Sequence, residues 1–250
     1  MKDQLYKYIL SIADNSLILG QRLGELCGHG PSLETDIACT NISLDLLGQT
    51  RSYFQYAARI KGGDASEDSI AFLRKERDYL NALLVEQPNT NFAYIMVRGY
   101  FFDVFHEMFL LELMKSKDEM LAAIAAKSIK EVRYHQAFSS EWVKRLGDGT
   151  AESNAKMQEA VNYLWRYTEE LFLPTEAETA MVAAGIGVDT APLKAKYYHK
   201  LKETLSTANL EIPSNKWFQK GGKQGIHTEH MGYLLSDLQY MQRTYPNMNW

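Results

Sequence analysis

Helical periodicity runs along most of this chain. In the first segment, one row of positions recurs at alternating steps of four and three, the spacing that gathers side chains on one face of a helix. The row consists of Leu5, Ile9, Ile12, Ser16, Leu19, Leu23 and Leu26. The sequence contains no sustained two-residue alternation of the kind that half-buried strands show. The pattern therefore predicts an all-α protein.

Glycines, prolines and capping residues mark the ends of the predicted helices. Ser32 is a predicted N-cap, and Ser116 with Glu119 and Thr175 with Glu178 have the spacing of capping boxes. All six prolines lie between periodic segments, where they remove no helical hydrogen bond. The predicted helices cover residues 5–26, 32–60, 66–85, 92–114, 116–145, 152–173, 175–185, 192–208 and 228–243, with one long irregular stretch at 209–225.

The predicted helices suit a single folding unit. The sequence has no internal repeat, no low-complexity segment and no shift in composition that would mark a boundary. Its 250 residues are enough to bury a sizeable core. We therefore expect one domain over residues 1–250, a four-helix bundle with additional helices packed on it.

Charge and cysteine content narrow the functional classes. The formal net charge of -4 gives no general attraction to nucleic acid or to an anionic membrane surface. Lys216, Lys220 and Lys223 are candidates for a local basic patch, and a solvated loop is the alternative interpretation. Cys27 and Cys39 are too few for a disulfide framework, which favours a reducing cytoplasm. We expect a cytoplasmic protein without a nucleic-acid or membrane partner.

Two stretches bear on targeting and membrane insertion. The N-terminal residues MKDQLYKYIL lack the uninterrupted apolar run and the cleavage site of a signal peptide. The most apolar later stretch, residues 92–113, cannot span a membrane because charged and polar residues interrupt it. These are Arg98, Asp103, His106, Glu107 and Glu112.

Acidic and histidine residues occur within three rows that are expected to face the core. Asp45 belongs to the second predicted helix, Asp103 and His106 to the fourth and His135 to the fifth. The rows are Asn41, Asp45, Gly48 and Ser52; Gly99, Asp103, His106, Leu110 and Leu113; and Leu121, Ile124, Ser128, Val132, His135 and Trp142. Because an unpaired polar group in a core is costly, these residues are the candidate functional site. The i, i+3 spacing also places Asp103 and His106 together.

Carboxylates and histidines on facing helices are typical of the di-iron site of ferritin-like bundles. There, each of two helices supplies one carboxylate and each of the other two supplies a Glu-x-x-His pair. Here Asp45 is followed at the histidine position by Gly48, and His135 is preceded at the carboxylate position by Val132. Glu131 is adjacent but points about 100° around the helix, toward solvent or a neighbouring helix.

The first predicted helix also lacks a ligand. Its middle, around Ile18 and Leu19, has no acid, and Asp14 and Glu25 lie on the flanking turns. Four interpretations of the candidate site remain open: a metal-free polar cluster in the core, a single weak metal site, a complete di-iron centre, or polar groups at the surface. Buried Asp–His pairs that satisfy each other favour the first. The residues of the candidate site are Asp45, Asp103, His106 and His135.

Signals for other chemistry are absent from the sequence. It has no phosphate-binding loop, no dinucleotide glycine fingerprint and no nucleophile elbow. The aromatic-rich stretch with Tyr163, Trp165, Tyr167 and Phe172 predicts packing against the core or a partner.

Five stretches of the chain together match the pattern of one known family. They are NISLDLLGQTR at 41–51, LVEQPN at 84–89 with Asn91 and Phe92, KEVRYH at 130–135 with Phe138, GGKQGIHTEHMG at 221–232, and LQYMQR at 238–243 with Trp250. These stretches resemble the C subunits of bacterial phenylacetyl-CoA epoxidases, which are multicomponent ring-oxygenases of phenylacetate catabolism. The resemblance extends over the whole chain, and the segment that contains His-Thr-Glu-His is its most specific part.

This resemblance implies a ferritin-like fold and a structural role. It implies partnership with a catalytic A subunit, a homologous bundle that carries the di-iron cofactor and binds the acyl-CoA, and with further subunits that include an NADPH-dependent reductase. The family's C subunit is regarded as having lost its metal ligands, and Gly48, Val132 and the first helix agree with that loss. We therefore expect no catalytic residue, no bound cofactor and no metal in this chain. Asp45, Asp103, His106 and His135 would then be a vestigial site.

Other functions remain as alternatives. One is a free-standing metal-dependent oxidase that uses the partial carboxylate–histidine site. Another is a metal-free helical module that binds a different partner. Self-association is compatible with each of these functions, and exposed aromatic residues together with residues 209–225 are candidates for partner contact.

Overall fold

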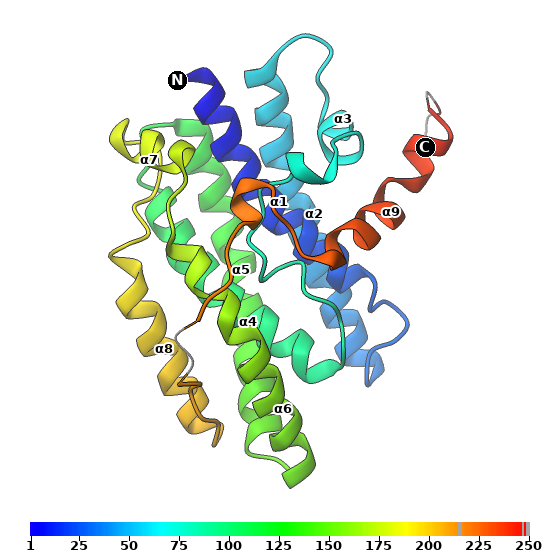
Figure 1. Cartoon of the computed structure of the whole chain (residues 1–250), viewed down its shortest axis with the longest axis vertical. Helices are drawn as coiled ribbons and strands as arrows, with labels where there is room; N and C mark the ends of the chain where they lie inside the picture. Colours follow the sequence, from blue (N-terminus) through cyan, green and yellow to red (C-terminus); the bar gives the residue numbers. More distant parts are fainter. Residues whose placement is uncertain (215–216, 247, 249–250) are drawn as a thin grey trace.

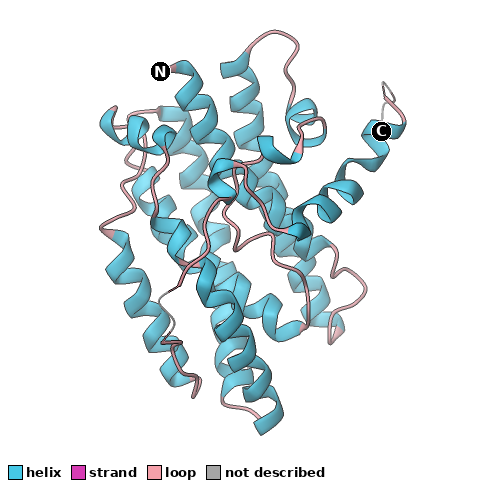
Figure 2. Ribbon diagram, in the orientation of Figure 1, coloured by secondary structure: helices cyan, strands magenta, loops and turns pink. Residues whose placement is uncertain are grey.

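The computed structural model describes residues 1–214, 217–246 and 248, and every regular element within them is helical (Figures 1 and 2). The all-α prediction is therefore confirmed. Helix α1 (Lys2–Gly24) packs along α2 (Leu33–Lys61), and α4 (Phe92–Leu113) packs along α5 (Glu119–Gly147). The two pairs meet where α2 contacts α5. These long helices form the bundle.

Shorter helices cover this bundle. Helices α6 (Ala151–Leu164) and α8 (Leu193–Thr207) pack on α4 and α5, and α7 (Glu176–Ala183) packs on α1. Helices α3 (Glu67–Phe72) and α9 (Glu229–Thr244) contact each other beside the α1/α2 pair. Single 3₁₀ turns complete the fold: η1 (Glu76–Asp78), η2 (Trp165–Tyr167), η3 (Glu169–Phe172) and η4 (Gly222–Gln224). No helix within the described residues is long and apolar enough to cross a membrane.

The apolar row predicted for the first helix is buried as expected, since Ile9, Leu19 and Leu23 are at most 5% exposed. The row predicted for α2 is wrong by about one position. Asn41 and Gly48 are exposed, whereas Ile42, Leu46, Gln49 and Tyr53 face the core. Adjacent rows on a helix differ by only 100°. Some apolar residues of α2 are also exposed, so its sequence does not clearly separate the face that packs on the core from the face that meets solvent.

The third predicted helix, residues 66–85, is also wrong in its second half. Helix α3 ends at Phe72, and residues 73–91 are irregular apart from η1. The cause lies on α1, where the Asp14 carboxylate accepts a hydrogen bond from the Leu80 N–H at 2.9 Å. Asn15 Oδ1 accepts one from the Ala82 N–H at 2.9 Å. These N–H groups are thus satisfied by side chains rather than by a helix.

The sixth predicted helix is shorter than expected. Helix α6 ends at Leu164, and the chain continues through η2 and η3 to Phe172. Trp165, Tyr167 and Phe172 are buried there, as predicted for this aromatic stretch. The rings of Phe101 and Trp165 meet edge to face at 5.9 Å.

The cap of α5 differs from the prediction. Asp118, not Ser116, is the N-cap, and its Oδ1 accepts a hydrogen bond from the Leu121 N–H at 3.0 Å. Ser116 instead donates to the Ile186 carbonyl at 2.7 Å. Asp118 Oδ2 also accepts from the Tyr56 hydroxyl at 2.6 Å.

We expect Asp118→Ala to lower the free energy of unfolding by about 1–2 kcal/mol, because it removes both the cap and the partner of Tyr56. The predicted capping-box partner Glu119 is exposed, so Glu119→Ala should cause no comparable loss. Urea unfolding of both variants tests this assignment. Equal losses would contradict it.

Candidate functional site

The structure joins two of the candidate residues directly. His135 on α5 donates from Nε2 to Asp45 Oδ2 on α2 over 3.0 Å. The His135 side chain is fully buried, whereas that of Asp45 is 37% exposed. Burial lowers the pKa of His135, and the hydrogen bond and charge of Asp45 oppose that effect. The pair therefore joins α2 to α5 at the border between core and surface.

Asp103 lies deeper, on α4. Its residue is 4% exposed, and its Oδ2 accepts a hydrogen bond of 2.7 Å from the Ser139 hydroxyl on α5. Burial raises the pKa of Asp103 to about 7, and the Ser139 hydrogen bond opposes the shift. A carboxyl group in this position is partly protonated near neutral pH.

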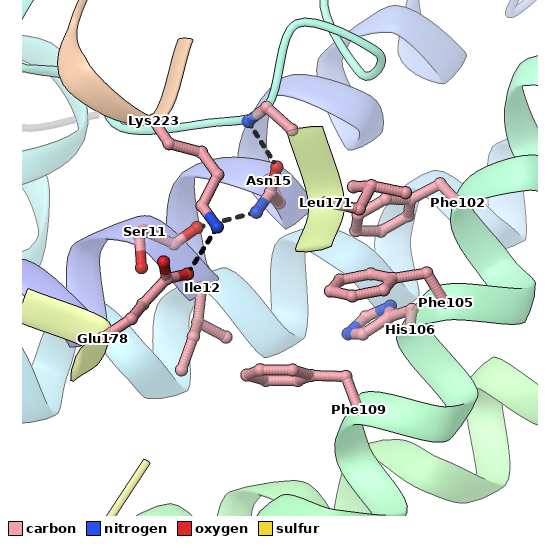
Figure 3. Close-up of a pocket in the computed structure, with 11 residues that line it drawn as sticks. Ser11, Ile12, Asn15, Phe102, Phe105, His106, Phe109, Leu171, Glu178 and Lys223 are labelled. Atoms are coloured by element: carbon pink, nitrogen blue, oxygen red, sulfur yellow. Dashed lines mark hydrogen bonds and ion pairs between the residues drawn. The ribbon is translucent and has the colours of Figure 1, made fainter. Parts of the chain in front are cut away.

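His106 does not pair with Asp103 as the spacing predicted. Its ring packs against Phe102 with centroids 5.0 Å apart, and it lines a small cavity of about 30 Å³ with Phe105 and Phe109 (Figure 3). Burial and the nearby His135 lower the pKa of His106 to about 3. Its Nδ1 has no hydrogen-bond partner among the described residues. His106 is therefore a neutral ring packed against phenylalanines, and the Lys223–Glu178 ion pair lines the same cavity.

These positions do not fit a di-iron group. Within the described residues, no three His, Cys, Asp or Glu side chains gather closely enough to hold a metal ion. The acids of α1 are already engaged, since Asp14 pairs with Arg74 and Glu25 with Arg22. The single metal site considered from sequence, with ligands Asp45, Asp103, His106 and His135, is likewise not assembled.

Comparison with known proteins places this bundle in a family. The sequence model of the phenylacetic acid catabolic protein family matches residues 1–250. The chain belongs to this family. The C subunit of the 1,2-phenylacetyl-CoA epoxidase of Escherichia coli (strain K12) is 49% identical over 248 residues, which cover 99% of this chain and 100% of that relative. The resemblance inferred from the sequence stretches is confirmed, and the fold is the ferritin-like helical fold of the family.

Sequence reasoning missed a second buried polar cluster in this family member. Glu86 is fully buried in the irregular segment before α4. Its Oε2 lies 2.7 Å from His227 Nδ1 and accepts a hydrogen bond of 2.9 Å from Asn81 Nδ2. Its Oε1 accepts from the Thr228 N–H at 2.6 Å and from the Thr228 hydroxyl at 2.7 Å. Glu86 and His227 both lie in stretches that carried the family resemblance, but neither belongs to a periodic row.

The loop that contains η4 is fixed by buried charge as well. Glu170 accepts hydrogen bonds of 2.7 Å from the N–H groups of Leu83 and Gly221. Lys223 is 9% exposed and pairs with Glu178 on α7 at 2.7 Å. Lys223 therefore belongs neither to a basic patch nor to a solvated loop, so both interpretations of this residue are wrong. Lys220 is exposed, and Lys216 lies outside the described residues.

Proposed function

We propose that this chain is a non-catalytic, single-domain subunit of a phenylacetyl-CoA epoxidase. In this proposal it supports a separate di-iron catalytic A subunit during phenylacetate breakdown. The proposal rests on the loss of carboxylate and histidine residues from positions where a di-iron bundle has metal ligands. The chain that shows this loss is related over its full length to the C subunit of such an enzyme. Gly48 and Val132 occupy two of these positions. The carboxylate and histidine that remain, Asp45 and His135, are bonded to each other.

The side chains of the candidate site are better suited to stability than to catalysis. Asp45 and His135 join α2 to α5, and Asp103 and Ser139 join α4 to α5. Glu131 also faces a neighbouring helix, because its Oε2 accepts a hydrogen bond from Gln49 Nε2 at 3.0 Å. Each contact satisfies a buried or half-buried polar group across a helix interface.

A surface for the partner subunit is offered by the adjoining outer faces of α2 and α5. Ile37 and Leu44 on α2 are 52% and 60% exposed, and Tyr134 on α5 is 51% exposed. A groove beside them is lined by Phe138 and Trp142 of α5 and is largely apolar. Exposed apolar groups of this kind mark protein interfaces. We call this surface, with Leu33, Ile37, Leu44, Tyr134, Phe138 and Trp142, the α2/α5 face.

We expect Ile37→Asp combined with Tyr134→Asp to weaken binding to the A subunit at least about a hundredfold, because two charges would be buried without partners. The matched control is Leu73→Asp, a 58% exposed residue at the end of α3. Co-purification and titration calorimetry with the A subunit measure the effect. Undiminished binding by the double variant would remove the α2/α5 face from the proposal.

The non-catalytic role has its own test in the assembled complex. We expect a complex that contains Asp103→Asn and His135→Gln to epoxidise phenylacetyl-CoA at close to the unmodified rate, provided that it assembles. A catalytic carboxylate or histidine contributes factors of about 10²–10⁴. A loss of that size in turnover, with assembly intact, would contradict the proposal.

A further inference from the structure

Helix α9 is attached to the rest of the fold over a small area. In Figure 1 it extends away from the bundle toward the C-terminus, and it packs on α3, η1 and part of α1. Met231, Leu234 and Leu235 are buried on one side of α9. On the other side Tyr233 and Tyr240 are 77% and 59% exposed. Gln239 and Arg243 also bond to the Arg74 carbonyl, so α9 is held by its first turn, by its buried apolar side and by these two side chains.

The first turn of α9 is held by the Glu86 cluster. Thr228, the N-cap residue of α9, directs both its N–H and its hydroxyl to Glu86 Oε1. Arg22 on α1 donates to the Glu86 carbonyl from Nε at 3.0 Å and to the His230 carbonyl from Nη2 at 3.3 Å. His227 and Glu86 have no exposed side-chain surface. The junction is thus a fully buried polar site.

The hydrogen bonds of His227 require a proton shared with Glu86. Its Nε2 lies 3.0 Å from the Tyr79 carbonyl, which can only accept, so Nε2 carries a hydrogen. Its Nδ1 lies 2.7 Å from Glu86 Oε2. That contact is favourable only if Nδ1 or the carboxyl group carries a hydrogen. Loss of this proton would set a lone pair against a buried carboxylate, which is costly.

We propose that Glu86 and His227 form a proton-dependent clasp, which holds α9 on the bundle and releases it when the pair loses its shared proton. This inference goes beyond the proposed function and holds whether or not the chain is a subunit. It assigns the His-Thr-Glu-His segment a conformational role. The released element would be α9 with its exposed tyrosines.

The charges around the pair favour the protonated state. Glu86 faces His227 directly, and Glu76 of η1 adds a second negative charge. Arg22 of α1 donates to the Glu86 carbonyl, and its positive charge opposes the effect of these two negative charges. On α9 itself, Glu229 and His230 follow Thr228. Burial lowers the pKa of His227, but the hydrogen bond and charge of Glu86 outweigh it, so the pKa is raised above 6.5.

The raised pKa of His227 determines how the attachment of α9 changes with pH. The folded pKa of His227 exceeds its unfolded value, so the clasp is fully formed below the unfolded value of 6.5. Its contribution is lost as the pH rises through the folded pKa. One proton is involved, so protection of α9 should fall by up to about tenfold for each pH unit between 6.5 and the folded pKa, and it should level off above the folded pKa.

Amide hydrogen exchange of the full chain tests the clasp. Protection factors, corrected for intrinsic exchange rates, would be measured from about pH 6 to about pH 9. We expect protection in α9 to fall over this range while protection in α2 and α4 stays constant. Constant protection of α9, or an equal fall in all helices, would overturn the proposal.

Two variants distinguish the effect of the proton shared by Glu86 and His227 from the effect of losing a hydrogen bond between α9 and the bundle. In Glu86→Gln the amide oxygen can still accept from Thr228, and the amide nitrogen can donate to a neutral His227 and to Asn81 Oδ1, for which the described part of the chain supplies no partner. We expect protection of α9 in this variant to be independent of pH. Gln239→Ala removes hydrogen bonds from α9 to Arg74 and Tyr79, so it should lower protection of α9 by the same factor at every pH. A pH dependence that persists in Glu86→Gln would refute the clasp.

Discussion

Asp14→Asn is expected to lower the free energy of unfolding by about 3–5 kcal/mol, since it leaves a buried guanidinium without its counter-charge. The Asp14 side chain is fully buried on α1, and both of its oxygens accept hydrogen bonds from Arg74. Arg74 is 10% exposed and lies 4.0 Å from the centre of the Tyr79 ring. Asp14 also holds the Leu80 N–H, so its loss would loosen the irregular segment as well.

Urea unfolding measures this effect, with Asp3→Asn as the matched control. Asp3 pairs with Lys7 at the surface of the same helix, where the side chains are 71% and 52% exposed. Exposed pairs contribute little, so we expect almost no change there. Replacing the pair with apolar residues, Asp14→Leu with Arg74→Met, should restore only part of the stability, because the Leu80 N–H would still lack its acceptor. A loss below about 1 kcal/mol for Asp14→Asn would show that Arg74 needs no anionic partner.

Asp103→Asn is expected to act in the opposite direction and raise the free energy of unfolding by about 1–3 kcal/mol above pH 7. The pKa of Asp103 is about 7 in the folded chain and 3.8 in the reference state. Above pH 7 the carboxylate is ionised in both states, and its burial costs about 1.4 kcal/mol for each pKa unit. Asparagine avoids this charge and can still accept the Ser139 hydrogen bond. The second amide hydrogen offsets part of the gain.

The gain from Asp103→Asn should depend on pH. It is full above the folded pKa of about 7, and it disappears as the pH falls toward 3.8, where the carboxyl group is protonated in both states. Thermal unfolding at about pH 4 and about pH 8 measures the difference. Asp64→Asn, at an exposed loop position, is the control. Destabilisation at the higher pH would mean that a cation compensates the Asp103 carboxylate.

The long helices could be predicted from the sequence because the residues that indicate a helix lie close together along the chain. The apolar row of the first helix, the N-cap Ser32 and the Thr175–Glu178 capping box were predicted correctly, since each depends on residues within a few turns. The segment 73–91 could not be read in this way. Its N–H groups bond to Asp14 and Asn15, more than 60 positions earlier in the chain. Local periodicity carries no information about partners at that separation.

The sequence could predict which residues belong to the candidate site, but not which side chains bond to one another. Asp45, Asp103 and His135 do lie at helix interfaces with polar partners. The expected Asp103–His106 contact fails because Asp103 reaches across to Ser139, and the choice between neighbours on two helices depends on side-chain rotamers. The Glu86–His227 pair joins residues 141 positions apart. Neither residue interrupts an apolar row, so no sequence pattern marked them.

Iron analysis of the purified chain is the most direct test of the central claim that Asp45, Asp103, His106 and His135 do not assemble a metal site. The chain would be loaded anaerobically with ferrous iron, desalted and analysed by plasma emission spectrometry. We expect far less than one iron per chain, with no difference between the unmodified chain and the Asp103→Asn and His135→Gln variants. About two irons per chain, as in an intact di-iron bundle, lost on either substitution, would contradict the claim.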